Sequence, residues 1–434
     1  MKPTLYRGAL FHTPRNPFHE EKALQAFADG ALVIAAGRIA ACGSYAEVGK
    51  AFPDVDVRDL RGGFLLPGFI DTHVHYPQIR ALGCLGLSLL DWLERNTLPE
   101  EVRFQEEPYA RRMARLFLHA LASHGTTTAL VFGSHFEAAM RAFFETAATS
   151  GLRIASGLVV ADRALRPELH SSPDRAYEQG SSLIRAFHSQ GRLSYAVTPR
   201  FALSTSEAML EACGALLREH PDLLCTTHWN ENAREVSAVN SLFPGDADYL
   251  AVYERFGLAG PRTVLAHSVQ SQDHELKRLA ALGASVAHCP CSNAALGSGI
   301  FPMRRHLAAG VPFALGTDVG GGTGFGMLKE SLHSYLMQRV SADGFPLQAA
   351  HLLYLATRAG AQAMGLESVT GDFSVGKAAD FVYLRAPAES PLDEAARAAE
   401  SEERLLSSVI TLADAACVRE VYVEGEVVYR NDAG

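Results

Sequence analysis

His73 and His75 stand two residues apart in the segment PGFIDTHVH, a spacing suited to a shared metal ion. Alternate residues of a β-strand point to the same side, so both imidazoles can face one site. Three more candidate ligands close later apolar runs: His228 in CTTHWN, His267 in TVLAHSV and Asp318 in ALGTDV. A single histidine at such a place is usually a hydrogen-bonded structural residue, but five coincident positions favour a metal site. Nitrogen and carboxylate ligands suit Zn²⁺, and Fe²⁺ or Mn²⁺ accept a similar set.

Glu231 follows His228 by three residues in THWNENAREV. A carboxylate beside a metal-activated water can take its proton and pass it to a ring nitrogen or a leaving amine. The same spacing also allows a plainer role, in which Glu231 or Glu235 favours the positive N-terminal end of the next helix. Spacing alone leaves both roles open.

The middle of the chain alternates eight short apolar runs with helical stretches such as residues 107–125 and 206–220. The runs occupy residues 64–75, 125–133, 152–160, 193–201, 223–230, 262–269, 284–290 and 311–319. Such alternation is typical of repeated βα units, and eight of them predict an α/β fold with a (β/α)8 TIM barrel. Barrels of this kind build their active site at the C-terminal ends of the strands, where the five candidate ligands stand.

Both ends of the chain have a different pattern, with short runs of alternating apolar and polar residues that are typical of strands. The step ADG at 28–30 and the step AAG at 35–37 suggest tight hairpins, and Glu424 with Gly425 marks a further turn. We therefore predict a small β-sandwich domain assembled from residues 1–66 and 370–434, and a catalytic barrel over residues 67–369.

Composition and charge exclude several classes of partner. The formal net charge is −9 and the sequence pI is about 6.0, so the chain as a whole repels a phosphate backbone and we expect no nucleic-acid polymer as partner. No run of eighteen apolar residues and no signal-peptide pattern is present, which predicts a cytoplasmic enzyme without a membrane partner. Seven cysteines, an odd number spread along a long chain, indicate reduced thiols rather than a disulfide framework.

The segment Cys289-Pro290-Cys291 looks like a thiolate site, but no second cysteine pair stands nearby to complete zinc-finger spacing. The H-x-E and P-C-x-x-C pattern of cytidine deaminases is also absent. We interpret both cysteines as part of a pocket wall and His288 as a structural residue. The glycines at 320–322 lack the G-K-[ST] ending of a phosphate loop and are expected to let the chain after Asp318 approach a substrate closely.

The order of PGFIDTHVH, HWNE, AHS and GTDV resembles the amidohydrolase superfamily, in which a distorted barrel carries one or two metal ions. The resemblance implies one zinc ion per subunit, with Fe²⁺ as an alternative, and the metal ligands His73, His75, His228 and Asp318. It places His267 beside the metal, where it polarises the attacked group. The run VTPRF offers Arg200 where binuclear members carry a lysine, which favours a single metal.

Five segments narrow the resemblance to the guanine deaminases: HVHYPQ at 73–78, LLDWLERNTLPEE at 89–101, VTPRFALS at 197–204, AHCPCSN at 287–293 and GTDVGGG at 316–322. The implied reaction is hydrolysis of guanine to xanthine and ammonia, with Glu231 as proton shuttle, Asp318 orienting the nucleophile and His267 stabilising the tetrahedral centre. Members of this family are commonly homodimers, and we expect the same here.

The same resemblance assigns purine contacts to Gln78, Arg200, Phe201, Glu231 and Asp318, and we expect His75, Trp92 and His228 to contact the purine as well. A flat purine needs an aromatic face, from Phe201 or Trp92, and donors for its carbonyl and ring nitrogens, from Arg200 and Gln78. Each has a plainer alternative: Arg200 pairs only with an acid, Gln78 is solvated, and Trp92 belongs to the core.

Two other functions compete with this interpretation. A related amidohydrolase with the same metal ligands could act on another aminated heterocycle, as triazine hydrolases and adenosine or S-adenosylhomocysteine deaminases do. A noncatalytic scaffold that keeps the barrel is disfavoured because every ligand position is filled.

Overall fold

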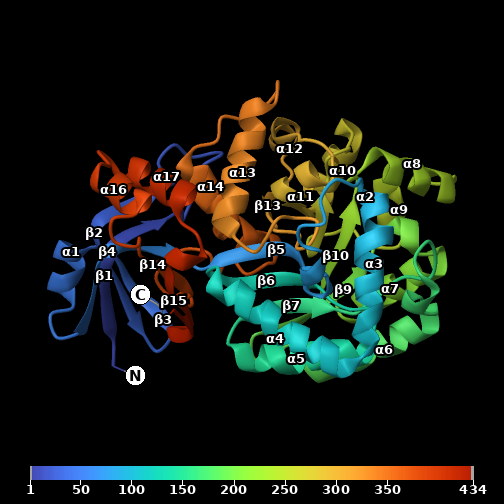
Figure 1. Cartoon of the computed structure of the whole chain (residues 1–434), viewed down its shortest axis with the longest axis horizontal. Helices are drawn as coiled ribbons and strands as arrows, with labels where there is room; N and C mark the ends of the chain where they lie inside the picture. Colours follow the sequence, from blue (N-terminus) through green and yellow to red (C-terminus); the bar gives the residue numbers. More distant parts are fainter. Residues whose placement is uncertain (1, 432–434) are drawn as a thin grey trace.

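The computed structural model describes residues 2–431, which form a barrel with a second, smaller sheet beside it (Figure 1). Eight parallel strands make up the barrel, as the eight apolar runs predict. They are β5 (Phe69–His75), β6 (Thr126–Phe132), β7 (Arg153–Gly157), β9 (Leu193–Pro199), β10 (Leu224–Trp229), β11 (Thr263–His267), β12 (Ser285–His288) and β13 (Phe313–Leu315). The two-residue strand β8 (Val159–Val160) pairs with β9 beside this path.

The barrel closes between β5 and β13 without a regular ladder. Several hydrogen bonds join the two sides: Thr72 Oγ1 donates to the Leu315 carbonyl at 2.8 Å, Asp318 N to the His73 carbonyl at 2.8 Å and His75 N to the Val319 carbonyl at 3.0 Å. The barrel is therefore distorted at one seam, and this seam ties the first candidate ligand to the last.

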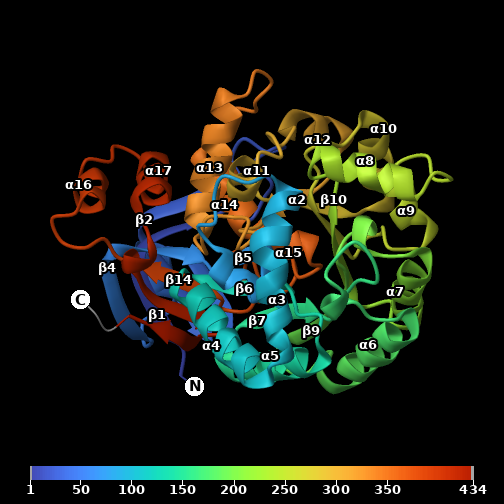
Figure 2. The same cartoon turned by 45° about the vertical axis from the view of Figure 1, so that its right-hand side comes forward.

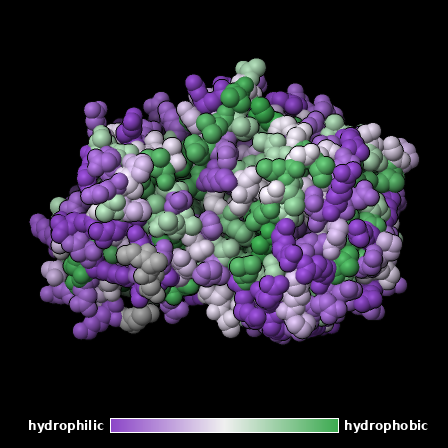
Figure 3. All heavy atoms as spheres, in the orientation of Figure 1, coloured by the Kyte–Doolittle hydropathy of each residue, from purple (hydrophilic) through white to green (hydrophobic). Residues whose placement is uncertain are grey.

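Helices follow the strands and cover the barrel (Figure 2). The predicted helix at 107–125 is α4 (Glu107–Ser123), and the one at 206–220 is α7 (Glu207–Glu219), which begins where the Ser206 hydroxyl accepts from Met209 N. The remaining helices of the barrel are α5 (Glu137–Ser150), α6 (Pro173–Phe187), α8 (Ala233–Leu242), α9 (Tyr249–Arg255), α10 (Asp273–Leu282), α11 (Pro290–Ala295), α12 (Met303–Ala309), α13 (Met327–Val340), α14 (Ala349–Ala356) and α15 (Arg358–Ala363). The helix α13 projects from the face seen in Figure 3 and exposes Leu336 and Val340 near its end.

A further helical segment crosses the barrel between η1 (Tyr76–Ala81) and α4. It consists of α2 (Leu89–Trp92), a π-helical turn η2 (Leu93–Thr97), α3 (Leu98–Val102) and the short η3 (Arg103–Gln105). This segment, residues 89–105, stands in front of the strands in Figure 2.

The second sheet combines strands from both ends of the chain, as predicted. Its order is β16-β15-β14-β4-β1-β2-β3, in one continuous path of hydrogen-bonded neighbours. The strands are β1 (Thr4–His12), β2 (Gln25–Ala35), β3 (Arg38–Ser44), β4 (Asp56–Pro67), β14 (Phe381–Leu384), β15 (Val418–Val423) and β16 (Glu426–Arg430), accompanied by α1 (Tyr45–Ala51), α16 (Pro391–Arg397) and α17 (Glu402–Leu412).

This sheet folds over on itself in the manner of a sandwich. The rings of Tyr6 on β1 and Tyr422 on β15 lie 5.6 Å apart, although two strands separate them along the hydrogen-bonded path. In a flat sheet, three strand spacings would hold them roughly 14 Å apart. Strands β1 and β15 therefore face each other across a shared apolar core. The domain boundaries at 66/67 and 369/370 stay a prediction.

Two details of the expected strands need correction. The step ADG at 28–30 is not a turn, because β2 runs through it. Gly30 lies opposite Gly8, where β1 has a register shift, and a Cβ on Gly30 would meet Leu10 Cβ at 2.7 Å, so the glycine serves close packing. The first apolar run is also divided: residues 64–67 end β4 of the second sheet, and only residues 69–75 form β5.

The other two predicted turns are confirmed. Ala36 and Gly37 join β2 to β3, and Glu424 and Gly425 join β15 to β16, all four with positive φ as such hairpins require. Among the described residues, no helix is both long enough and apolar enough to cross a membrane.

Candidate metal centre and active site

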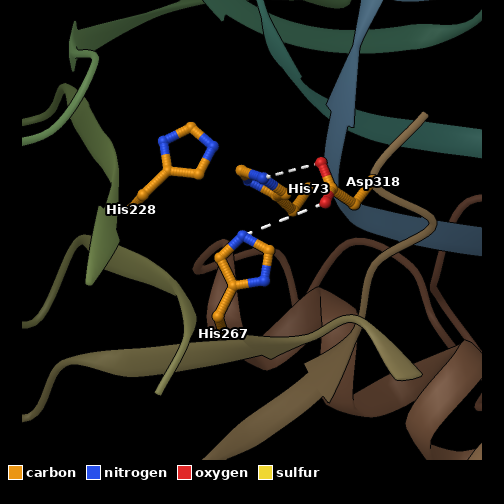
Figure 4. A group of neighbouring side chains, drawn as sticks. All are labelled: His73, His228, His267 and Asp318. Carbon is orange, nitrogen blue, oxygen red and sulfur yellow. Dashed lines mark ion pairs between the residues drawn. The ribbon is translucent and has the colours of Figure 1, made fainter. Parts of the chain in front are cut away.

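The five candidate ligands meet at one end of the barrel. His73 and His75 lie on β5, His228 near the end of β10, and His267 is the last residue of β11. Asp318 stands three residues beyond β13 and is held by the seam to β5. Figure 4 shows His73, His228, His267 and Asp318 pointing toward a common centre. Their ligand atoms all lie within 4.8 Å of one another.

His75 belongs to the same group by its distances. Its Nε2 lies 3.2 Å from His73 Nε2, 3.2 Å from His228 Nε2 and 3.2 Å from Asp318 Oδ1, while His73 Nε2 is 3.4 Å from that same oxygen. A tetrahedral metal with ligand bonds of about 2.0–2.2 Å places its ligand atoms roughly 3.3–3.6 Å apart. The four measured spacings suit a shared metal ion, and His267 brings the number of clustered candidate ligands to five.

Burial sets the protonation of the group in a way that suits metal binding. Burial lowers the pKa of His73, lowers that of His75 to about 4 and lowers that of His228 well below its ordinary value. Burial alone would raise the pKa of Asp318, but hydrogen bonds from His73 and His75 outweigh it and lower that pKa well below the usual range. Neutral imidazoles and an ionised carboxylate are the forms that bind metal.

His267 is oriented from behind by Asn293. The Nδ1 atom of His267 lies 2.9 Å from Asn293 Oδ1, an acceptor, so this nitrogen donates. Its other nitrogen, Nε2, faces Glu231 Oε2 at 3.4 Å and Asp318 Oδ2 at 3.9 Å. His267 and Asp318 both have positive φ, 78° and 48°, a conformation that costs energy in residues with a side chain and is often found at functional sites.

The structure separates the two roles that spacing left open for Glu231 and Glu235. Glu235 makes the capping box of α8: its Oε2 accepts from Glu231 N at 3.0 Å and from Asn232 N at 3.2 Å. The side chain of Glu231 takes no part in that cap. It is buried beside the candidate metal ligands, and Ser298 Oγ donates to its Oε1 at 3.2 Å. Burial, and then the charge of Asp318, raise the pKa of Glu231 well above its ordinary value.

A cavity opens over the candidate ligands. Its polar lining includes Gln78, Arg200 and Glu231 together with His75, His228, His267 and Asp318, and its apolar lining comprises Leu89, Trp92, Leu93, Phe201 and Leu296. All eight predicted substrate-binding residues therefore line one cavity. Trp92 and Phe201 also pack together with Leu296 in a small buried cluster, so Trp92 belongs both to a core and to the cavity wall.

Arg200 and Gln78 share a partner that the sequence did not reveal. The carboxylate of Glu101, on α3, accepts from Arg200 Nη1 at 2.5 Å and from Gln78 Nε2 at 2.9 Å. His135 Nε2 lies 3.4 Å from the same carboxylate. Arg200 therefore does pair with an acid, but it also lines the cavity. The alternative that Gln78 is solvated is wrong, because this side chain is only 2% exposed.

The cysteines of the segment 289–291 lie behind the cavity, not in its wall. Cys291 Sγ contacts His333 Nδ1 at 2.7 Å, and Cys289 is fully buried. The reason is that α11 turns Asn293 and Leu296 toward the site instead. His288 bonds Ser334 Oγ at 3.2 Å, as a structural residue would.

Close approach explains the glycines that follow Asp318. A Cβ on Gly320 would stand 2.4 Å from the Gln78 carbonyl oxygen, and one on Gly321 would stand 2.8 Å from Ser292 Oγ and 3.1 Å from Asp318 Oδ2. The loop therefore packs closely against residues of the site, whereas its expected approach to a substrate stays a prediction.

Residues 64–428 match the amidohydrolase family, and residues 30–54 separately match a bacterial imidazolonepropionase-like composite domain. The fold and the cluster of histidines with an aspartate agree with the longer match. The chain belongs to the amidohydrolase family.

Relatives define its place within that family. A probable guanine deaminase of Deinococcus radiodurans is 58% identical over 99% of both chains. The solved guanine deaminase of E. coli is 36% identical with a TM-score of 0.94 over all of both chains. The guanine deaminase of C. acetobutylicum, solved with guanine bound in its active site, is 25% identical with a TM-score of 0.91 over 98% of this chain and all of that one. Within the amidohydrolases, the chain belongs with the guanine deaminases.

Proposed function

We propose that this hydrolase converts guanine and water to xanthine and ammonia, using one zinc ion per subunit. The observation that carries the proposal is the shared cavity: four of the five candidate ligands, His75, His228, His267 and Asp318, line it together with Arg200, Gln78 and two aromatic side chains. Its relatives named as guanine deaminases support the same substrate. The cytoplasmic location and the homodimeric state stay predictions.

His73, His75, His228 and Asp318 would hold the zinc, since the Nε2 atom of His75 already lies 3.2 Å from a ligand atom of each of the other three. Bound zinc supplies Lewis acidity that makes a water molecule nucleophilic near neutral pH. Fe²⁺ would suit the same ligands, so the choice of metal is part of the proposal.

Glu231 would move the proton in this reaction. Water adds its oxygen to C2 of guanine, and Glu231 takes the proton released and gives it to a ring nitrogen. The hydroxyl proton of this adduct then passes to the amino group, the C2–amino bond breaks, ammonia leaves, and the C2–oxygen bond becomes the carbonyl of xanthine. The neighbouring Nε2 of His267, 3.4 Å from Glu231, is placed to stabilise charge on the attacked carbon's new oxygen.

The walls of the cavity suit a purine. Phe201 and Trp92 offer apolar faces on which a flat ring can stack. Arg200 donates only, so it selects a carbonyl oxygen or an unprotonated ring nitrogen, whereas the Gln78 amide can donate or accept. Ser298 donates to Glu231 and leaves its second oxygen free to face His267 and the cavity.

A substrate panel tests the proposal. Purified protein is assayed for ammonia release from guanine, adenine, cytosine, adenosine and a triazine, with xanthine identified as the product of the first. We expect guanine to give by far the highest kcat/KM. Preference for adenosine or a triazine would contradict guanine as the substrate and favour a related amidohydrolase that acts on another aminated heterocycle. If zinc-loaded protein releases no ammonia from any of these compounds, the noncatalytic scaffold would be favoured.

A further inference from the structure

Within residues 2–431, Glu101 is the one carboxylate that touches both polar side chains proposed to select the purine. Oε2 accepts from Arg200 Nη1 at 2.5 Å, and Oε1 accepts from Gln78 Nε2 at 2.9 Å. These side chains come from distant parts of the chain, η1 after β5 and the end of β9. A single buried group therefore fixes the position of one relative to the other.

The surroundings of Glu101 show that this contact is not an incidental surface ion pair. Glu101 and Arg200 are each 3% exposed, and the third neighbour, His135, is 9% exposed. Removing two charges from water is costly unless each is paired and hydrogen-bonded. Burial alone would raise the pKa of Glu101, but the positive charge of Arg200 and the bond to His135 outweigh it and lower that pKa. The carboxylate is thus ionised and the pair is maintained.

The chain segment that carries Glu101 also forms the apolar wall of the cavity. Leu89, Trp92 and Leu93 line the cavity from α2 and η2, and Glu101 follows on α3. The two ends of this segment are held differently. Near its start, Asp91 pairs with Arg234 at 3.0 Å on the surface, whereas near its end Glu101 is held inside the protein.

We infer that Glu101 is a positioning residue for substrate selection: it holds Arg200 and Gln78 in the orientation that reads the carbonyl side of the purine, and it anchors residues 89–102 over the cavity. This inference rests on the proposed function. Glu101 does not touch the substrate itself, because both of its oxygens are used by Arg200 and Gln78.

The test is Glu101→Gln, compared on guanine and on 2-aminopurine, which keeps the reacting amino group but lacks the carbonyl. The variant retains the shape and one acceptor but loses the charge opposite Arg200. We expect kcat/KM for guanine to fall roughly tenfold to a hundredfold, mainly through KM, because loss of orientation weakens binding. For 2-aminopurine the fall should be smaller, so the preference for guanine should narrow. Glu101→Asp keeps the charge and should restore part of that preference.

Glu100→Gln is the matched control, because Glu100 neighbours Glu101 on α3 but bonds Arg103 and Tyr109 outside the cavity. It should leave both substrates unaffected. Thermal unfolding and zinc content of each variant separate misfolding from misorientation.

Equal losses of kcat/KM on both substrates in folded, zinc-loaded Glu101→Gln would assign Glu101 a purely structural role, and unchanged kinetics would overturn the inference as well. The proposed function fails by a different result, the absence of guanine deamination by the unaltered protein.

Discussion

Replacing Glu231 by glutamine tests the proton transfer most sharply, because the structure separates this residue from its neighbours. The amide has the same size as the carboxyl group and can still accept from Ser298 Oγ, which bonds Oε1 at 3.2 Å. The helix that follows keeps its capping box, since Glu235 makes that box. Glu231→Gln should therefore fold and bind zinc normally while losing only the group that exchanges protons.

The expected loss follows from the worth of a general acid or base, about 100-fold to 10,000-fold in rate. This range corresponds to about 3–5 kcal/mol of activation free energy. The assay is guanine turnover followed by xanthine formation, with zinc measured on the same samples. Because a capping box accepts glutamine in place of glutamate, Glu235→Gln is the matched control and should keep kcat within about tenfold. If Glu231→Gln retains full zinc and turns over guanine within about threefold of the unaltered protein, the assigned proton shuttle is wrong.

Three further predictions concern the neighbours of the site. Arg200→Lys keeps a positive charge opposite Glu101 but loses the planar fork, so KM for guanine should rise at least about tenfold in steady-state kinetics; an unchanged KM would count against the purine contact. Asn293→Ala removes the acceptor for His267 Nδ1 and should lower kcat by about tenfold or more with zinc retained, whereas unaltered kcat would show that His267 needs no such partner. Burial raises the pKa of Glu330 from 4.5 to about 8, so between these pH values the folded protein holds a proton that the unfolded chain has lost. The contribution of protonated Glu330 to the free energy of unfolding is therefore complete below pH 4.5 and is lost as the pH rises toward 8. In urea unfolding, Glu330→Gln should therefore lose less stability between pH 5 and 8 than the unaltered protein does. The same pH dependence in both proteins would contradict the raised pKa of Glu330.

The barrel and the clustering of the five candidate ligands at one of its ends could be predicted because both depend on local patterns. Each inner strand is a short apolar run between a helix end and a polar residue, and the polar residue falls at the C-terminal end where the barrel builds its site. His73 and His75 needed only the two-residue period of a strand. The hairpins at Gly37 and Gly425 likewise follow from short-range turn preferences.

Features that depend on packing between segments distant along the chain could not be predicted from local sequence patterns. Gly30 looked like a turn residue, but its role depends on Leu10 on the neighbouring strand. Cys289 and Cys291 were placed in the cavity wall because sequence cannot tell which side of α11 faces the site. Glu231 and Glu235 have similar local settings, and only the capping hydrogen bonds distinguish them.

Glu101 is the clearest case of a residue that local reasoning passes over. The sequence TLPEE reads as the acidic first turn of a helix, where glutamates usually face solvent. Its partner Arg200 lies 99 residues further along the chain. The expected burial of Arg200 in a pocket, with no acid nearby in the sequence, indicates that a distant carboxylate pairs with it. The sequence does not identify Glu101 as that carboxylate.

Titration of metal-stripped protein with zinc tests the central claim most directly. The protein is treated with chelator, its residual zinc is measured, and guanine turnover is followed as zinc is added back. We predict that turnover is lost with the metal and returns in proportion to added zinc until one equivalent per chain is bound, with His228→Ala binding zinc far more weakly. Full guanine turnover by protein shown to lack metal would contradict the account, and so would a requirement for two zinc ions per chain.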